Sequence, residues 1–575
     1  MASKDFFLVA AIDFGTTFSG YAFSEVTEFQ ADPLRVSTCT WGSSTNSVMS
    51  LKTPSSILFR PEKTFDSFGF EAEDKYSNLS LDNMHRSWFY FRRFKMMLYN
   101  SKDVHRSNLL KDETGKEMPA IDVFAASIRY MKDHLGDFLS RRSTQIRDNE
   151  IRWVLTVPAI WDDAAKQFMR EAAEKAGIDG QALLLALEPE AASMCCKYLP
   201  VERMETRIEC FSPRSKYLVL DAGGGTVDIT VHEVNPDGTL KELHKANGGP
   251  WGGTTVDQAF LDFLSEILGA DVLQTFRDGH RDDYIDLLRE FETRKRAVKP
   301  DSDSRVTFKM PISLHELYRK MKKAEIRDAV RDHPKYGGKI TCAGDKMRVD
   351  ADLIIALFSK TCYAIVKHIR DLLQNTSTRD TSTFLMVGGF SESPMLQDAI
   401  KKGFPDKKVV VPPDAGLTVL KGAVIFGHNS KMIVSRIAKY TYGFKCWQQF
   451  DPSIHPKERK EVRNNRYEVQ GCFDKIVEVG QPVSPDSPIG PQQYSPQENE
   501  EWFSAKLFAS PNKNPLFVDE EGTLRIGEVE VDCRDDKGNV SSADVYLIFG
   551  GTELEVKAVH SDTGRETKAK FDFLG

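Results

Sequence analysis

The chain has 575 residues, of which 28% are charged, and a formal net charge of −7. At roughly 100–200 residues per domain, this length accommodates three to five domains. The mild acidity argues against a nucleic-acid-binding protein, because it implies no broad basic surface. Nine scattered cysteines without metal-ligand spacing favour a reducing compartment, and we interpret Cys195-Cys196 as helix-buried thiols rather than a redox site.

The apolar runs of the chain are too short to cross a bilayer, which takes about 20 residues. The first run, Phe6–Ile12, is followed at once by Asp13 and is too short for a signal peptide. We therefore expect a soluble protein of the cytoplasm or the nucleus, with no membrane span.

The run Phe6–Ile12 predicts a buried strand that ends in a distinctive turn. Asp13-Phe14-Gly15-Thr16-Thr17-Phe18 places a carboxylate, a glycine and two hydroxyls directly after this strand. The residues that follow favour β structure, so we expect a hairpin rather than a helix after the turn.

The segment from Thr53 to Gly115 is mixed and aromatic, with its centre at Trp88–Leu98. One interpretation is an amphipathic core segment whose basic residues are solvated. The other is that one lysine points into a phosphate site. Spacing alone does not distinguish these interpretations.

Helix and strand patterns then alternate. Three-to-four spacing of apolar residues predicts helices over Ile121–Leu139 and Asp163–Gly177. Strands are predicted at Trp153–Ala159 and Leu183–Leu187, the second ending at Glu188-Pro189. This alternation indicates an α/β layer.

The most informative stretch is Lys216–Asp228, in which a short apolar run ends in Asp221, Gly223-Gly224-Gly225, Thr226 and Asp228. Consecutive glycines allow a sharp turn and expose backbone N–H groups, which together form a concavity suited to phosphate oxygens. The two aspartates can hold Mg²⁺ through water. The alternative is a glycine hairpin with two surface acids.

The strand–Asp–Gly–Thr pattern occurs twice, at Asp13 and at Asp221, about two hundred residues apart. This repetition suggests two related lobes that grip one polyphosphate from opposite sides. Neither turn is a Walker loop, because no Gly-Lys-Ser/Thr follows. Neither is a dinucleotide fingerprint, because a hairpin follows instead of a helix.

The remainder of the α/β part contains further glycine turns and helices. A second glycine cluster stands at Gly248–Thr254, and a third strand-to-glycine turn at Phe384–Phe390, followed by a helix. Helices are predicted at Asp257–Leu268, Asp282–Lys299 and Asp350–Gln374, and a final one opens at Pro412-Pro413-Asp414 and runs through Gly422. The charged face of the second of these helices is by default a solvated salt-bridge face.

From about residue 430 the periodicity changes to short alternating strands. Strands are predicted at Leu524–Val531, Val545–Phe549 and Glu553–Val559, whereas the proline-rich segment Gln481–Gln497 is predicted to be a loop. The tail is therefore expected to be a separate all-β domain of 145 residues, 431–575.

With these motifs in place, the chain resembles the actin/hexokinase/heat-shock ATPase superfamily, and most closely the 70-kDa heat-shock chaperones. Asp13–Thr17 and Asp221–Asp228 look like the family's two phosphate motifs, and Val387–Gly389 looks like its adenosine motif. Val154–Ala159 with Glu188-Pro189 looks like the first connecting segment, and Asp414–Ala423 like the second connecting helix. The five motifs occur in the family's order.

The fold implied by the resemblance is α/β: a two-lobed, actin-like ATPase with ribonuclease H-like duplicated lobes, followed by an all-β sandwich. The ATPase domain is expected at 1–430, with lobe I at about 1–213 and 412–430 and lobe II at about 214–411. Residues 431–575 would form the substrate-binding-like β domain.

The resemblance also implies a site for ATP or ADP with Mg²⁺. The expected nucleotide-binding residues are Gly15, Thr16, Thr17, Phe18, Gly223, Gly224, Gly225, Thr226, Gly252, Gly253, Glu292, Lys295, Arg296, Lys299, Gly388, Gly389, Phe390 and Asp414. The expected catalytic residues are Lys95, Glu188, Asp221 and Thr226, and the expected residues around hydrated Mg²⁺ are Asp13, Asp221 and Asp228.

Four departures from the family pattern point to its 12A/12B-type branch and to weak coupling between the domains. Lys431–Tyr440 stands where the family has an acidic, leucine-rich linker, and the chain ends at Gly575 without the family's helical lid. Lys166 replaces the arginine partner of Pro158, and Glu392 replaces an adenine-stacking arginine. We therefore expect fast peptide exchange and doubtful dependence on J-domain partners. The alternative for Ser430–Lys439 is a helix extension that fixes the domains rigidly.

Two classes of function remain open from the sequence. One is a nucleotide-gated, chaperone-like ATPase whose β domain binds polypeptide. The other is a scaffold or signalling protein that holds nucleotide with little turnover. A small-molecule kinase is disfavoured, because the sugar kinases of this superfamily lack a β-sandwich tail.

Overall fold

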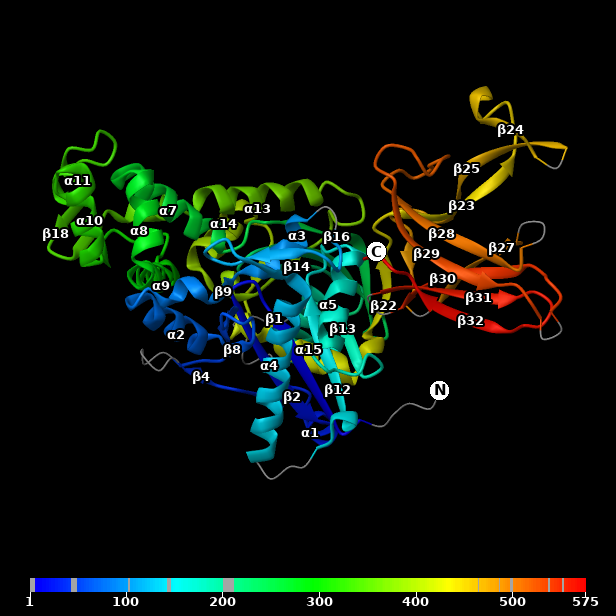
Figure 1. The fold of residues 1–575 in the computed structure, drawn as a ribbon, viewed down its shortest axis with the longest axis horizontal. Helices are drawn as coiled ribbons and strands as arrows, with labels where there is room; N and C mark the ends of the chain where they lie inside the picture. Colours follow the sequence, from blue (N-terminus) through cyan, green and yellow to red (C-terminus); the bar gives the residue numbers. More distant parts are fainter. Residues whose placement is uncertain are drawn as a thin grey trace.

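Two α/β sheets lie beside each other in one part of the molecule, and two C-terminal antiparallel sheets lie at one end of its long axis (Figure 1). The computed structural model describes residues 6–42, 49–101, 104–141, 146–199, 211–463, 465–485, 487–496, 500–535, 538–550 and 553–574. Within these ranges no helix is both long enough and apolar enough to cross a membrane.

The first α/β sheet is built around β1, whose seven residues are all buried. Its strand order is β13 (Leu183–Leu187), β12 (Ile151–Val157), β1 (Leu8–Phe14), β2 (Phe18–Glu25) and β3 (Ser37–Thr38), with β6 (Thr53–Pro54) also paired to β2. β1 runs parallel to β12 and antiparallel to β2. The predicted hairpin after the first Asp–Gly–Thr turn is therefore confirmed.

The second α/β sheet repeats this arrangement around β14. Its strand order is β21 (Lys408–Val410), β20 (Thr383–Val387), β14 (Lys216–Ala222), β15 (Val227–Val234), β16 (Leu240–Gly249), β22 (Ile433–Ile437) and β26 (Pro482–Val483). β14 runs parallel to β20 and antiparallel to β15, as β1 does to β12 and β2. The two Asp–Gly–Thr turns thus occupy equivalent places in two sheets of the same order.

A shared apolar core lies between the two sheets. It contains residues of β1, β12, β14 and β20 together with α6 (Glu188–Tyr198) and α15 (Ala415–His428). A side chain at Gly422 of α15 would overlap the backbone carbonyl of Ala191 in α6, so glycine allows the two helices to approach closely. Cys195 and Cys196 are buried in this core as free thiols, as predicted.

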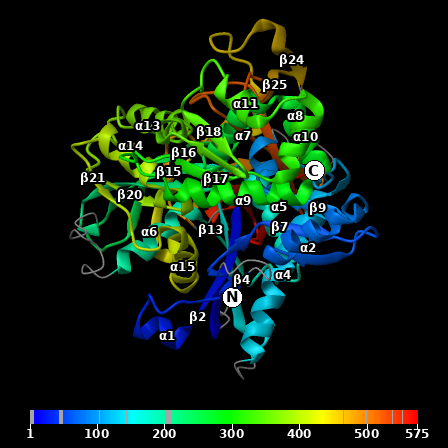
Figure 2. The same cartoon turned by 90° about the vertical axis from the view of Figure 1, so that its left-hand side faces the viewer.

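The remaining helices pack against the sheets or against one another. They are α1 (Val26–Ala31), α2 (Phe70–Leu81), α3 (Met97–Asn100), α4 (Ala120–Arg141), α5 (Asp163–Lys175), α7 (Thr254–Leu268), α8 (Ala270–Gly279), α9 (Arg281–Ala297), α10 (Ile312–Lys322), α11 (Ile326–Arg331), α12 (Ala351–Ala356), α13 (Ser359–Leu372) and α14 (Pro394–Gly403). Figures 1 and 2 show α8, α10 and α11 gathered at the end of the molecule opposite the C-terminal sheets. The predicted single helix over Asp350–Gln374 is wrong, because Leu357 and Phe358 separate α12 from α13.

Small sheets complete this part of the chain. Their members are β4 (Trp41–Gly42) with β5 (Met49–Ser50), β7 (Ser56–Phe59) between β8 (Phe65–Phe68) and β9 (Phe89–Arg92), β10 (Leu109–Lys111) with β11 (Glu117–Pro119), and β19 (Lys346–Val349) between β17 (Val306–Lys309) and β18 (Ile340–Ala343).

The C-terminal part is strand-rich, as predicted. One sheet has the order β24 (Lys460–Arg463), β25 (Arg466–Val477), β23 (Thr441–Gln449), β28 (Trp502–Ser510) and β29 (Leu524–Asp532). The other has the order β27 (Pro488–Tyr494), β30 (Ala543–Gly550), β31 (Glu553–His560) and β32 (Glu566–Lys570). Buried residues of both sheets form one apolar cluster. The segment Gln481–Gln497, predicted to be a loop, contains β26 and β27 because its prolines lie on edge strands, where no ladder N–H is required.

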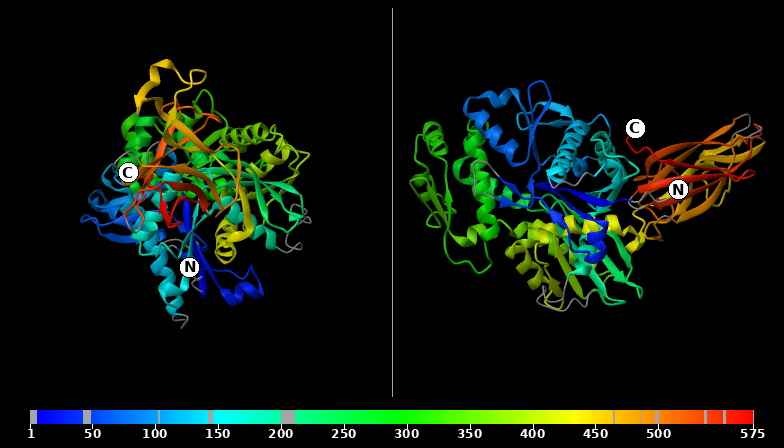
Figure 3. Two further views of the ribbon diagram at one scale, coloured as in Figure 1. Left: turned by 90° about the vertical axis from the view of Figure 1, so that its right-hand side faces the viewer. Right: turned by 90° about the horizontal axis from the view of Figure 1, so that it is seen from below.

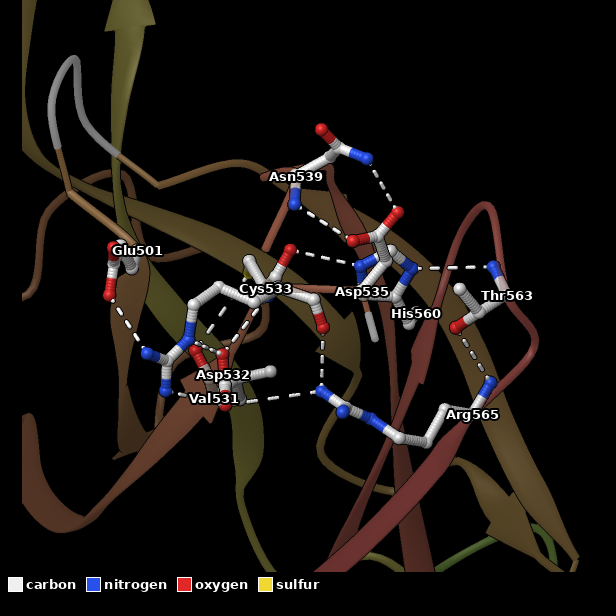
Figure 4. A network of polar contacts seen from close by, with 10 residues as sticks. Glu501, Val531, Asp532, Cys533, Asp535, Asn539, His560, Thr563 and Arg565 are labelled. Atoms are coloured by element: carbon white, nitrogen blue, oxygen red, sulfur yellow. Dashed lines mark hydrogen bonds and ion pairs between the residues drawn. The ribbon is translucent and has the colours of Figure 1, made fainter. Parts of the chain in front are cut away.

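A polar network ties together the turns at one end of these strands (Figure 4). The Arg534 guanidinium binds the carboxylates of Asp532 and Glu501 at 3.0 Å. Arg565 donates to the Arg534 carbonyl at 2.8 Å, and an imidazole nitrogen of buried His560 lies 2.9 Å from the Cys533 carbonyl. These groups satisfy one another, so we assign the network to turn stability.

The junction between the α/β part and the β region is a docked strand rather than a helix extension. β22 pairs in parallel with β16, at the edge of the second sheet. The Arg436 guanidinium makes two 2.7 Å bonds to the buried Glu190 carboxylate of α6. The Ile437 N–H donates to Glu242 at 2.8 Å, and Lys439 Nζ donates to the Trp161 carbonyl at 2.8 Å. The segment Lys431–Tyr440 has no acidic leucine run, as the sequence indicates, and it docks through backbone pairing and polar side chains instead.

The last described residues also contact the first α/β sheet. Leu574 is fully buried in the same apolar cluster as β1 and α4. The Arg106 guanidinium bridges Asp572 and Glu171 of α5 at 2.9 and 2.6 Å. Two separate segments therefore fasten the β region to the α/β part. The right-hand view of Figure 3 shows the β region at one end of the molecule. The blue-cyan and green-yellow halves of the α/β part lie beside each other in the rest of it.

Arg436→Met is expected to destabilise the junction by about 3–5 kcal/mol, because it leaves the Glu190 carboxylate buried without its ion-pair partner. Urea denaturation measures the change. The matched control is Arg319→Met, whose ion pair with Glu325 lies at the surface and should contribute little to stability. Equal losses in the two variants would contradict the role given to the junction pair.

Glu242 makes the stability of the junction depend on pH. Burial raises its pKa from 4.5 to about 7, so its contribution is fully present below pH 4.5 and is lost as the pH rises to about 7. Glu242→Gln keeps an acceptor for the Ile437 N–H but removes the titration. Between pH 5 and pH 8 the variant should gain stability relative to the wild type, by up to about 3 kcal/mol. Urea denaturation at both pH values, with exposed Glu458→Gln as control, tests this, and parallel wild-type and Glu242→Gln profiles would refute it.

Candidate functional site

Hydrogen bonds from Ser55 fix the backbone of the first turn. A side chain at Gly15 would overlap the Phe18 carbonyl, so only glycine fits there. The Ser55 hydroxyl donates to the Gly15 carbonyl at 2.6 Å, and the Ser55 N–H donates to the Thr17 carbonyl at 2.9 Å. These bonds fix the turn and leave Thr16 and Thr17 at its tip.

The second turn is braced by the second glycine cluster, at the start of α7. The N–H groups of Gly252 and Gly253 donate to the Gly225 and Gly223 carbonyls, each at 3.1 Å, and the Thr254 N–H donates to the Gly224 carbonyl at 2.8 Å. Gly252 and Gly253, predicted to bind nucleotide, therefore use their N–H groups to support the turn. Within the described residues the N–H groups of Gly224 and Gly225 have no acceptor.

The two turns face each other. A side chain at Gly224 would overlap the Thr17 hydroxyl, and one at Gly225 would lie 2.6 Å from the Thr16 hydroxyl. Glycine is thus required where the tips of the two turns meet. The structure brings these predicted phosphate-binding residues together from positions about two hundred residues apart.

Four largely buried carboxylates lie beside these turns: Asp13, Asp221 and Asp228 are buried, and the side chain of Glu188 is 13% exposed. Burial raises the pKa of Glu188 to about 7, despite the neighbouring Lys95. Burial also raises the pKa of Asp221 well above its usual range, and the charges of Glu188, Asp228 and Asp13 raise it further. At Asp13 burial acts in the same direction, but the charges of Lys52 and Lys95 outweigh it and lower the pKa.

The hydrogen bonds of these carboxylates differ. The Thr156 hydroxyl donates to Asp13 at 2.8 Å, the Thr226 hydroxyl donates to Asp228 at 3.1 Å, and the Ile160 N–H donates to Asp228 at 2.9 Å. Asp221 Oδ2 is buried without a hydrogen-bond partner among the described residues.

A hydrated divalent cation fits this arrangement. Two ammonium groups, of Lys52 and Lys95, face the four carboxylates. Two further positive charges would therefore balance the cluster once Asp221 and Glu188, whose pKa values are raised, are ionised. The orphaned Asp221 oxygen also lacks a donor or a cation. No three His, Cys, Asp or Glu side chains of the described ranges converge closely enough to coordinate a metal directly. Asp13, Asp221 and Asp228 would therefore hold Mg²⁺ through water, as Mg²⁺ permits.

Lys95 is buried in the cluster, on a 3-10 turn at Phe94–Met96. Its Nζ donates to Glu188 at 2.7 Å and lies 5.2 Å from the centroid of the Trp161 ring. Of the two interpretations of the Trp88–Leu98 segment, the structure supports the one in which a lysine points into the site.

The three predicted residues on α9 interact mainly with one another. Glu292 accepts from Lys295 at 2.5 Å and from Arg296 at 2.7 Å. The Arg296 guanidinium carbon lies 5.6 Å from the centroid of the ring of Phe18, the first residue of β2. Lys299 lies past the end of α9 with an exposed side chain, and no contact of that side chain brings it to the site.

The third turn joins the cluster from β20. Gly388 has φ +84°, and a side chain there would overlap Asp221 and the Ala222 carbonyl. Gly389 begins a short 3-10 turn, in which Phe390 is buried beside Gly253. Glu392 accepts from the Gly416 N–H at 2.9 Å, at the start of α15. Asp414 precedes this helix with an exposed side chain, 3.5 Å from Lys421, and so points away from the cluster.

The sequence interpretation missed three residues of the site. Lys52 Nζ lies 2.5 Å from Asp13, and Asp257 of α7 binds both Lys295 at 2.6 Å and Arg93 at 2.7 Å. Asp257 follows the second glycine cluster in the first turn of a helix, which was a usable signal. Lys52 and Arg93 stand in segments without periodicity, and no local pattern pointed to them.

Comparison with known proteins places these motifs in context. The model of the family described as "Hsp70 protein" matches residues 91–332. Heat shock 70 kDa protein 12A of Mus musculus is 33% identical over 99% of this chain and 92% of that protein. Heat shock 70 kDa protein 12B of Homo sapiens is 34% identical over 99% of this chain and 91% of that protein. The chloroplastic stromal 70 kDa heat shock-related protein of Pisum sativum is 25% identical over 58% of this chain and 41% of that protein.

Gly224→Val is expected to lower ADP affinity by at least about tenfold, or 1.4 kcal/mol. The new side chain would occupy the space where the two turns meet and where phosphate is expected. Isothermal titration calorimetry measures the change. The control is Gly136→Ala in α4, where an added methyl group meets nothing within 4 Å. If ADP bound Gly224→Val as tightly as it binds the control, the assignment of the phosphate loops would be wrong.

Proposed function

This chain belongs to the heat shock 70 kDa protein family, and we propose that it binds Mg-ATP or Mg-ADP between two lobes and hydrolyses ATP slowly. The proposal places the ATPase domain at 1–430, with an actin-like division into two lobes, and a β-sandwich domain at 431–575. Within this assignment the β domain binds a polypeptide or protein partner, and the protein acts as a chaperone in the cytoplasm or the nucleus.

The observation that carries the proposal is the meeting of two equivalent glycine turns beside four buried carboxylates. The N–H groups of Gly224 and Gly225 and the hydroxyls of Thr16 and Thr17 would hold phosphate oxygens from both sides. The side chains of Lys295 and Arg296, together with Phe390 and the Gly388-Gly389 turn, would contact the nucleoside. Glu392 is engaged with α15 and offers no cation for adenine stacking.

Hydrolysis in such a site depends on positioning and on neutralisation of charge. Bound Mg²⁺ would neutralise charge that develops on the phosphate oxygens. Asp221 has an oxygen free to orient or deprotonate a water molecule. Lys95 would leave Glu188 to contact the γ-phosphate, and Thr226 would keep Asp228 in place through its 3.1 Å hydrogen bond.

A second candidate function is a scaffold that keeps nucleotide bound with little turnover. The ion pairs favour it. Lys95 is held by Glu188, and Glu292 is held by both Lys295 and Arg296, so several groups must exchange partners before they contact a nucleotide. The docked junction likewise favours a β region that moves little, and it does not restore the family linker through which J-domain partners would act.

Asp221→Asn and Lys95→Ala are expected to lower the rate of ATP hydrolysis by about 10²–10³, since each removes a contact to the reacting groups. ADP affinity should stay within about tenfold of the wild type. Release of phosphate, with and without an unfolded peptide, measures turnover, and calorimetry measures affinity. The control Asp237→Asn changes an exposed turn between β15 and β16.

Wild-type turnover in both catalytic variants would refute the assigned roles. Nucleotide binding without measurable hydrolysis in the wild type, and without stimulation by peptide, would select the scaffold. No nucleotide binding at all would refute both functions.

A further inference from the structure

Lys52 places a second ammonium group in the carboxylate cluster. Its Nζ lies 2.5 Å from Asp13 Oδ2, and the side chains of Lys52 and Asp13 are 17% and 7% exposed. The other Asp13 oxygen accepts from the Thr156 hydroxyl at 2.8 Å. Both oxygens of this carboxylate, which was expected to face hydrated Mg²⁺, are therefore already occupied by the chain itself.

The position of Lys52 is built into the first sheet. The next residues, Thr53-Pro54, form β6 and pair with Phe18 and Ser19 of β2, directly after the first turn. The side chain of Lys52 passes over Gly20, because a Cβ atom added at Gly20 would lie 3.1 Å from Lys52 Cγ. The lysine side chain thus reaches Asp13 of β1 by passing over Gly20 of β2. The pairing of β6 with β2, the strand that follows the first turn, fixes the backbone next to Lys52.

The balance of carboxylates and ammonium groups in the cluster explains why the contact between Lys52 and Asp13 matters. Without Lys52, four carboxylates would face Lys95 alone. An ammonium at hydrogen-bond distance neutralises a carboxylate much as a bound cation does, because buried charges are stable only when paired.

We propose that Lys52 is a built-in counter-cation of the nucleotide site, which supplies part of the positive charge that a metal ion would otherwise provide at Asp13. This inference rests on the proposed function and specifies its cation requirement. ADP binding should then depend only weakly on Mg²⁺, since the chain keeps one cation beside Asp13 at all times. Asp221 and Asp228 are left as the residues that face hydrated Mg²⁺.

The test compares ADP affinity with saturating Mg²⁺ and with EDTA, by calorimetry on the full chain. For the wild type, removal of Mg²⁺ should weaken ADP binding by less than about tenfold. Lys52→Met keeps the length of the side chain but removes the charge, so its loss on removal of Mg²⁺ should be at least about tenfold larger than that of the wild type. Lys52→Arg restores a cation and should recover the wild-type dependence.

The matched control is Lys75→Met, which breaks an ion pair of 2.6 Å to the buried carboxylate of Asp66 outside the site. It should leave the Mg²⁺ dependence unchanged.

Equal Mg²⁺ dependence in the wild type and a folded Lys52→Met would overturn the inference while leaving the proposed function intact. If Lys52→Met does not fold, the wild type decides alone, because a loss of more than about tenfold in EDTA also overturns the inference. No ADP binding by the wild type in either condition would instead overturn the proposed function, and the inference with it.

Discussion

The burial of four carboxylates where two equivalent sheets meet is the constraint on which the rest of the site depends. Taking like charges out of water is costly unless cations and hydrogen bonds compensate them. The chain meets this demand partly with Lys52 and Lys95, partly with the hydroxyls of Thr156 and Thr226, and leaves Asp221 Oδ2 unsatisfied. The unsatisfied oxygen and the residual negative charge are what give the site a use for a cation.

Ion pairs between distant segments hold the two lobes against each other around this cluster. Arg289 of α9 binds Glu73 of α2 at 2.9 Å, and Arg93 binds Asp257 of α7 at 2.7 Å. Such partly exposed pairs contribute little individually, but they join elements that a nucleotide would otherwise bridge. These pairs join α9 to α2 and Arg93 to α7, and the glycine turns meet in the same region of the molecule.

Local chemistry explains what the sequence could predict. Strands that end in Asp–Gly–Thr turns, the hairpins after them and the strand-rich tail all follow from residues that are neighbours in the chain, and the structure has each of them. Lys52 and Asp257 escaped prediction because their partners lie 38 or more residues away. The break between α12 and α13 escaped because it depends on the buried packing of Phe358, not on a proline or a glycine. Gly252 and Gly253 were found, but their N–H groups serve the neighbouring turn, which only the hydrogen bonds reveal.

The docked junction changes the interpretation of Lys166, the residue that replaces the family's arginine partner of Pro158. Lys166 pairs with Asp163 of its own helix at 3.2 Å, so it gives the segment after Pro158 no link to the β region. Lys439 does: it donates to the carbonyls of Ala159 and Trp161, on either side of Ile160, whose N–H binds Asp228 in the site. One tripeptide thus contacts the carboxylate cluster and the β region at once. Such a shared contact couples the carboxylate cluster to the β region only if the tripeptide has two arrangements and each site favours one of them. The Ile160 N–H that binds Asp228 lies between the two carbonyls that Lys439 binds, so a second arrangement of this tripeptide would alter both sets of contacts.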